Sequence, residues 1–170
     1  MDQATRDMLE GLKQAMQAER YGQTFYQLAA TNTADRMGKE VFEQLAREEQ
    51  HHFEFLATHY RSLLDKGVPA AGARLDPHGA ITQSSPIFSD SLRARIKGAH
   101  FEMSALAVAV QLELNAVTHY REQARTATLA ELKSFYQQLA DWESSHYHAL
   151  LGQQQSLQES YWTENGFEKF

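Results

Sequence analysis

The sequence predicts an all-α protein, an antiparallel four-helix bundle, and three observations lead to that fold class. All three prolines, Pro69, Pro77 and Pro86, fall in one stretch near the middle of the 170-residue chain. The proline-free segments on either side are rich in Ala, Leu, Glu and Gln, residue types that favour helix over strand. Apolar residues recur there at alternating steps of three and four, which is typical of helices packed nearly parallel in a bundle.

The first half of the chain predicts two helices, over residues 4–30 and 35–64, joined by a short turn near residues 31–34. A turn this short makes the two helices an antiparallel hairpin. Their apolar stripes contain Leu9, Leu12, Met16 and Tyr26 in the first helix, and Phe42, Leu45, Leu56 and Leu63 in the second.

The second half predicts another such hairpin, from a helix over residues 91–125 and a helix that begins after Thr128. Thr128 and Glu131 have the spacing of a capping box, which marks the start of a helix. The stripes here contain Leu106, Val110, Val117 and Tyr120 in the third helix, and Leu132, Tyr136, Leu139 and Leu150 in the fourth.

We therefore expect a single domain over residues 1–170. It has a helix pair over 4–64, a long crossover over 65–90, a second helix pair over 91–157 and a tail over 158–170. A crossover of this length can join distant ends of a bundle. The tail is too aromatic for a solvated segment, and we expect it to pack on the bundle or on a second subunit. Its aromatic residues are Tyr161, Trp162, Phe167 and Phe170.

Composition excludes several classes of protein. The chain has no cysteine, which excludes disulfide scaffolds, thiolate metal sites and cysteine nucleophiles. There are 16 basic and 22 acidic residues, a net charge of −6, and no basic run that would predict nucleic-acid binding. The longest apolar run, residues 105–110, is far shorter than a membrane span, and the first twenty residues carry four acidic groups. We expect a soluble cytoplasmic protein.

Every predicted helix carries a carboxylate in the middle of its apolar stripe, where a leucine is expected. The four carboxylates are Glu19, Glu49, Glu113 and Glu143, and two imidazoles, His52 and His146, follow on the same faces. A buried carboxylate without compensation costs several kcal/mol, so four together would unfold a domain stable by about 5–15 kcal/mol. No lysine or arginine lies on these stripes. Two divalent cations would neutralise the four carboxylates, so the pattern predicts a di-metal site with these six ligands.

An internal repeat supports this prediction. Glu19 precedes Glu49 by 30 residues, and Glu113 precedes Glu143 by the same 30. Adding 94 maps the first half onto the second. The mapping takes Glu19 to Glu113, Tyr26 to Tyr120, Phe42 to Tyr136, Glu49 to Glu143 and His52 to His146. A pseudo-twofold bundle therefore preserves its ligand set in both halves.

Tyr26 and Tyr120 lie two turns after Glu19 and Glu113 on the same faces, and they have two interpretations. They are either core aromatics or residues that also hydrogen-bond a ligand carboxylate.

Other glutamates and histidines are assigned away from the site. Glu48 and His51 have the spacing of Glu49 and His52 but lie about 100° round the helix. Their repeat partners are Trp142 and Ser145, so we interpret both as surface or rim residues. His59 is assigned to the core or the bundle end. Four histidines remain as surface residues, namely His78, His100, His119 and His148.

Four strings of the sequence resemble the rubrerythrin-type branch of the ferritin-like superfamily. They are Glu19-Arg-Tyr-Gly-Gln-Thr-Phe-Tyr26, Leu45-Ala-Arg-Glu-Glu-Gln-His-His52, the segment from Glu113 to Tyr120, and Leu139-Ala-Asp-Trp-Glu-Ser-Ser-His146. The resemblance covers residues 4–157 and implies a ferritin-like fold. It implies two iron ions bound by the six ligands, with Glu49 and Glu143 close to both ions. Family members react reduced iron with hydrogen peroxide or dioxygen.

Two departures from the family pattern have consequences. Without cysteine there is no rubredoxin domain, so we expect an external electron donor. Rubrerythrins commonly place an extra glutamate one turn after the third-helix ligand, where this sequence has Ala116, and the repeat position is Gly22. We therefore expect the plain six-ligand set.

Three functions remain open from the sequence. The first is an oxidoreductase whose two iron ions act on hydrogen peroxide or dioxygen, with peroxide reduction preferred. The second is a ferroxidase that oxidises Fe(II) for iron handling. The third is a non-enzymatic structural or sensing site, in which manganese or zinc replaces iron. We expect a homodimer and no nucleic-acid or membrane partner.

Overall fold

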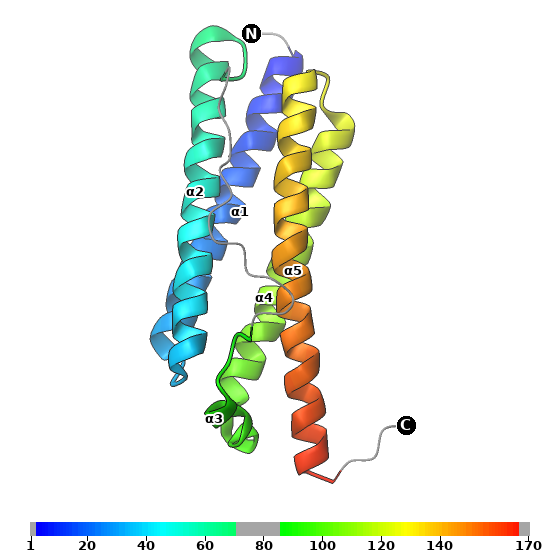
Figure 1. Ribbon diagram of the computed structural model, residues 1–170. Helices are drawn as coiled ribbons and strands as arrows, with labels where there is room; N and C mark the ends of the chain where they lie inside the picture. The colour runs from blue at the N-terminus through cyan, green and yellow to red at the C-terminus, as the bar shows by residue number, and fades with distance from the viewer. Residues whose placement is uncertain (1–2, 71–85, 167–170) are drawn as a thin grey trace.

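Four long helices form the bulk of the protein, as a computed structural model that describes residues 3–70 and 86–166 shows (Figure 1). The elements are α1 (Gln3–Asn32), α2 (Arg36–Lys66), α3 (Asp90–Arg93), a 3-10 turn η1 (Ile96–Gly98), α4 (His100–Thr126) and α5 (Ala130–Glu164). The residues described contain no strand. The predicted all-α, ferritin-like helical bundle is confirmed.

The long helices associate as two hairpins, α1 with α2 and α4 with α5, and the hairpins meet where α1 lies against α4. Figure 1 shows the helices of each hairpin side by side, joined at one end by a short turn. The turns are residues 33–35 and 127–129. Within the described ranges, no helix combines the length and the apolar character that a membrane span requires.

The predicted crossover lies largely outside the described residues, which omit 71–85. Its beginning is clear. Gly67 follows the last residue of α2 with φ of 71°, and its backbone N–H donates to the carbonyl oxygen of Leu63 at 3.0 Å. This left-handed cap ends the helix, and glycine is the residue that adopts it without steric cost.

The expected continuous helix over residues 91–125 is wrong at its start. The chain forms the single turn α3 and then η1, and the long helix α4 begins only at His100. The physical reason is packing. Ile87, Phe88, Leu92 and Ile96 are all buried in one core cluster, and the interrupted backbone allows it. Gly98, a poor helix former, lies at the break.

The fourth long helix differs from expectation at both ends. Its N-cap is Leu129, which makes no side-chain cap hydrogen bond, so the capping box predicted from Thr128 and Glu131 is absent. The helix continues to Glu164, through most of the segment predicted as a tail. Tyr161 packs against the core, as expected, whereas Trp162 is 45% exposed. Phe167 and Phe170 lie outside the described residues.

The core consists of two apolar clusters along the bundle. One contains Tyr26 and Phe42, and the other contains Tyr120 and Tyr136. The stacking in each cluster repeats the same geometry. The ring centroids of Tyr26 and Phe42 are 6.3 Å apart at 21°, and those of Tyr120 and Tyr136 are 6.2 Å apart at 22°. The internal repeat of the sequence is thus visible in the packing.

Two further buried carboxylates, Asp35 and Glu102, form hydrogen bonds between the two halves of the chain at one end of the bundle. Asp35 is the N-cap of α2 and accepts from the backbone N–H of Gly38 at 2.9 Å. The same side chain accepts from the backbone N–H and the hydroxyl of Ser89, which precedes α3. Glu102, in the first turn of α4, accepts from the Thr33 hydroxyl at 2.8 Å. These contacts hold the α1–α2 turn to the second half of the chain.

Candidate metal centre

The six predicted ligands meet at the middle of the bundle. Glu19 comes from α1, Glu49 and His52 from α2, Glu113 from α4, and Glu143 and His146 from α5. Each is at most 5% exposed. Helical periodicity explains the convergence, because every one of these residues replaces an apolar residue on the inward face of its helix.

Potential ligand atoms fall into two overlapping groups. Glu19, Glu49, His52 and Glu143 bring one atom each within 4.8 Å of one another, and Glu113, Glu143 and His146 do the same. Glu143 belongs to both groups, so its carboxylate lies between them. Glu49, which the family resemblance also placed near both metals, belongs to the first group alone.

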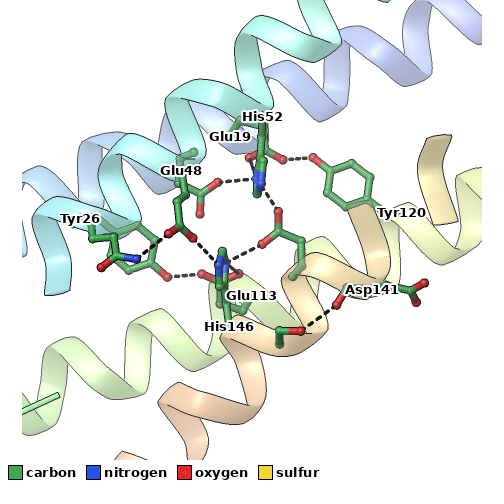
Figure 2. Close-up of polar contacts among 12 residues, drawn as sticks. Glu19, Tyr26, Glu48, His52, Glu113, Tyr120, Asp141 and His146 are labelled. Atoms are coloured by element: carbon green, nitrogen blue, oxygen red, sulfur yellow. Dashed lines mark hydrogen bonds and ion pairs between the residues drawn. The ribbon is translucent and has the colours of Figure 1, made fainter. Parts of the chain in front are cut away.

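The imidazoles face the carboxylates through their Nδ1 atoms (Figure 2). His52 Nδ1 lies 2.8 Å from Glu143 Oε1 and 3.3 Å from Glu19 Oε2. His146 Nδ1 lies 3.4 Å from Glu143 Oε2 and 3.8 Å from Glu113 Oε2. Each half of the site therefore presents one ring nitrogen and several carboxylate oxygens to a common point.

Burial dominates the electrostatics of the carboxylates. Burial raises the pKa of Glu19, Glu49 and Glu113, because removal from water disfavours the charged form. Repulsion from Glu143 raises the pKa of Glu113 further. Burial acts the same way on Glu143, but the attraction of His52 and the close contacts with both histidines outweigh it and hold the pKa of Glu143 well below its usual range.

The histidines respond in the opposite sense. Burial lowers the pKa of His52, but the neighbouring Glu143 and the other carboxylates outweigh it and hold the pKa well above the usual value. The pKa of His146 is raised in the same way, by Glu143 and by Glu48. The buried carboxylates therefore favour a positive charge next to them, which either a protonated imidazole or a metal ion can supply.

The two tyrosines hydrogen-bond ligand carboxylates, and they do so across the bundle. Tyr26 of α1 donates to Glu113 Oε1 of α4, and Tyr120 of α4 donates to Glu19 Oε1 of α1 (Figure 2). Each tyrosine thus reaches the glutamate of the other helix. The carboxylate hydrogen bonds that the second interpretation requires are therefore present, and the role of these carboxylates as metal ligands stays a prediction.

The interpretation of Glu48 as a surface or rim residue is wrong. Its side chain is 3% exposed, and Oε2 lies 2.6 Å from His146 Nε2, on the opposite edge of the ring from Nδ1. Its Oε1 accepts from Gln44 at 2.9 Å. A neighbouring carboxylate of this kind fixes the orientation and tautomer of a metal-binding histidine. His51 is exposed, as predicted.

The sequence contained a signal for the burial of Glu48. Its repeat partner is Trp142, a large apolar residue that indicates a covered position. The difference in residue type between Glu48 and Trp142 instead predicted a surface or rim position for Glu48. In the structure the two residues occupy equivalent positions, because each contacts one histidine of the site. Glu48 contacts His146, and the ring of Trp142 lies beside that of His52, with ring centroids 5.7 Å apart.

The residues of this cluster fit a pair of metal ions. Buried atoms without a hydrogen-bond partner include Glu19 Oε2, Glu113 Oε2, both oxygens of Glu143 and the Nδ1 atoms of His52 and His146. Among the described residues, no lysine or arginine is buried. Acceptor oxygens and imidazole nitrogens without donors are the ligand set that divalent transition metals prefer. The cluster can therefore hold metal.

A cavity of about 310 Å³ between α1 and α4 leads to this cluster. Glu19, Glu49 and Glu113 line its inner part. Gly22 also lines it, and a Cβ atom there would lie 3.1 Å from Glu49 Cδ. The close approach of the Glu49 carboxylate explains why a glycine occupies this helix position. Glycine inside a helix costs about 1 kcal/mol of stability relative to alanine.

The remaining histidines lie outside the ligand groups. His59 is buried against Phe55 and Phe135, as predicted for a core position. His100 and His148 are exposed, as predicted, and His78 lies outside the described residues. His119 differs from expectation, because it is half-buried and lines the cavity beside α1.

Comparison with known proteins agrees with this arrangement. The sequence model of the family described as Rubrerythrin matches residues 10–105, more than half of the chain, and this match includes Glu19, Glu49 and His52. No curated protein and no solved structure matches significantly. The family match and the buried cluster of carboxylates and histidines agree, and the chain belongs to the rubrerythrin family.

Proposed function

We propose that this protein is a di-iron oxidoreductase that reduces hydrogen peroxide and also reacts with dioxygen. The observation that carries the proposal is the pair of overlapping ligand groups that share Glu143. A pair of metal ions requires two ligand groups with a common carboxylate, whereas a single structural ion would require only one ligand group.

The assignment of ligands follows the two groups. Glu19, Glu49 and His52 would hold one ion, Glu113 and His146 would hold the other, and Glu143, which belongs to both groups, would contribute to both. When bound, a reduced iron pair supplies the two electrons that cleave a peroxide bond. Carboxylate ligands suit this chemistry because they are hard and anionic.

The protein's own residues hold the ligands in place and limit the access of water. The two apolar clusters cover the centre from both ends of the bundle. Tyr26 and Tyr120 orient the carboxylates of Glu113 and Glu19 by donating hydrogen bonds to them. Glu48 orients the ring of His146. Such neighbours keep a site close to its productive geometry.

Substrate and electrons reach the centre by different means. The cavity between α1 and α4 gives a small oxidant access to the carboxylates. The chain has no cysteine for an iron–sulfur or rubredoxin-type relay, so we propose a separate molecule as the electron donor that restores the reduced state.

A single-turnover experiment tests the proposal. Protein loaded with two Fe(II) ions per chain under anaerobic conditions is mixed with hydrogen peroxide, and separately with dioxygen, and the ferric absorption is followed. We expect one peroxide to oxidise both ions rapidly. Glu143→Gln abolishes the paired reaction, whereas the exposed control Glu131→Gln leaves it intact.

Other outcomes separate the alternatives. Oxidation of many Fe(II) ions per chain by dioxygen, with little peroxide reaction, would indicate a ferroxidase. Retention of iron without reaction toward either oxidant, or a preference for zinc, would contradict the oxidoreductase and favour a structural or sensing site.

A further inference from the structure

The cavity between α1 and α4 combines two chemical surfaces. Its inner end is formed by the buried carboxylates of Glu19, Glu49 and Glu113. Its sides include Gly22, Leu112 and Ala116, which carry no polar side-chain atom. The side chains of Gln14 and Asn115 are exposed and form part of the outer rim. A molecule in this cavity would meet the candidate metal ligands at one end and mostly apolar side walls along its length, to which Tyr21 and His119 also contribute.

The cavity is larger than hydrogen peroxide requires. Its volume is about 310 Å³. Each water molecule in the liquid takes up about 30 Å³, and hydrogen peroxide is roughly twice that size. Pockets that hold small organic ligands begin at about 300 Å³. Space therefore remains for an organic group next to a peroxide.

The internal repeat keeps both walls small at the same point. Gly22 of α1 and Ala116 of α4 are related by the 94-residue shift, and both line the cavity. A longer side chain at either position would enter the space beside the carboxylates. Gly22 is also required by the carboxylate of Glu49, whereas Ala116 is not one of the candidate ligands. Ala116 therefore offers a way to fill the cavity without changing a ligand.

We propose that this cavity binds the alkyl group of a small organic hydroperoxide, an inference that rests on the proposed peroxide chemistry of the same centre. The hydroperoxide group lies toward the carboxylates and the alkyl group against Gly22, Leu112 and Ala116. The O–O bond would break as two electrons from the reduced iron pair and two protons taken up from the solvent convert the hydroperoxide into one alcohol and one water. Both metal ions are oxidised by one electron each.

A substrate comparison tests this inference. Fe(II)-loaded protein is mixed with hydrogen peroxide or tert-butyl hydroperoxide, for the wild type, Ala116→Leu and the matched control Ala107→Leu, an exposed alanine on the same helix. We expect tert-butyl hydroperoxide to oxidise both ions in the wild type. Ala116→Leu lowers the ratio of the tert-butyl hydroperoxide rate to the hydrogen peroxide rate by roughly tenfold or more, and Ala107→Leu leaves this ratio unchanged. Ala18→Leu, from the α1 side of the cavity, provides a second filling variant.

Binding is measured separately on zinc-loaded protein, which does not turn over. We expect tert-butyl alcohol, the product, to shift the amide resonance of Gly22 in the wild type but not in Ala116→Leu.

The possible failures are distinguishable. Rapid oxidation by hydrogen peroxide, with tert-butyl hydroperoxide unreactive or insensitive to both filling variants, would overturn the organic-hydroperoxide inference and leave the peroxidase proposal standing. If neither peroxide oxidises the bound iron, both are overturned. A wild-type Gly22 amide resonance that does not respond to the alcohol would also overturn the inference.

Discussion

Tyr26 donates a hydrogen bond to Glu113, 87 residues further along the chain, and so joins the α1–α2 hairpin to the α4–α5 hairpin at the metal centre. Tyr120 and Glu19 make the same connection in the reverse direction. Because each hydroxyl meets a buried carboxylate, these bonds serve both the packing of the two halves and the orientation of two ligands.

We predict that Tyr26→Phe lowers the free energy of unfolding by about 1–3 kcal/mol, because it removes a buried hydrogen bond to the carboxyl group of Glu113 and keeps the ring. Tyr120→Phe should have a similar effect, since the contact is repeated. Urea unfolding of the metal-free protein measures both. The exposed Tyr21→Phe is the control and should stay within about 0.5 kcal/mol of the wild type. Equal stability of all three variants would show that the two cross-helix bonds contribute nothing.

Glu48 should affect one metal position more than the other. Its Oε2 lies 2.6 Å from His146 Nε2, whereas the ring of His52 faces Trp142. We predict that Glu48→Gln weakens binding of one of two ions by about 10–100-fold and leaves the other nearly unchanged. Titration of the metal-free protein with Co(II), followed by its absorption, resolves the two steps.

The neighbouring His51→Gln, at an exposed position of the same helix, is the matched control and should bind both ions as the wild type does. A Glu48→Gln protein with both affinities intact would contradict the assigned role of Glu48.

Asp35 should make stability depend on pH in the acid range. Burial by itself raises its pKa, but hydrogen bonds from Ser89 and Gly38 outweigh burial and hold the pKa below the usual 3.8. A lowered pKa means that this stabilisation is complete above the unfolded-state value and is lost as pH falls through the folded-state value. We predict that Asp35→Asn is less stable than the wild type at pH 6 and that the difference shrinks below about pH 4.

Denaturant unfolding of the metal-free proteins at several pH values measures this difference in the free energy of unfolding. Both proteins contain the same buried carboxylates and histidines, so the titration of these groups cancels in the difference. Asp35→Ala, which also lacks the cap, should lose a further 0.5–2 kcal/mol or so at every pH. A wild-type advantage over Asp35→Asn that grows toward low pH would contradict the sign of the argument.

Two helix glycines should respond to alanine in opposite ways. A Cβ atom at Gly38 would overlap Cδ1 and Cε1 of the buried Phe88 ring, whereas a Cβ atom at the exposed Gly152 would meet nothing within 4 Å. We predict that Gly38→Ala destabilises by about 1–3 kcal/mol, despite better helix propensity, because the ring must move. Gly152→Ala should stabilise by about 0.5–1 kcal/mol. Thermal unfolding of both variants checks the pair, and stabilisation by Gly38→Ala would show that Phe88 moves freely.

Much of the fold could be predicted because its signals are local or repeated. Prolines confined to one stretch and apolar steps of three and four identify the two helix pairs. The positions of the buried carboxylates follow from the same periodicity, and the 94-residue repeat separates Glu49 from Glu48. The start of α4 was not predictable in this way, since it depends on the packing of Ile87, Phe88 and Ile96 beneath the bundle.

Contacts between helices could not be predicted from the faces of single helices. Tyr26 shares a face with Glu19, yet its hydroxyl bonds Glu113 on α4, because the distance across the bundle decides the partner. Glu48 lies beside the inward stripe of α2, and only the rotation of α2 against α5 brings it to His146. Both residues are at positions where neighbouring helices, and not helical period, determine the contact.

Metal content tests the central claim most directly. The wild type, Glu143→Gln and the exposed control Glu131→Gln are loaded anaerobically with Fe(II), freed of excess metal and analysed for iron per chain. The account predicts two iron ions per chain in the wild type and the control, and a marked loss in Glu143→Gln, whose carboxylate lies in both ligand groups. One ion or none in the wild type, or full retention in Glu143→Gln, would contradict the di-metal centre.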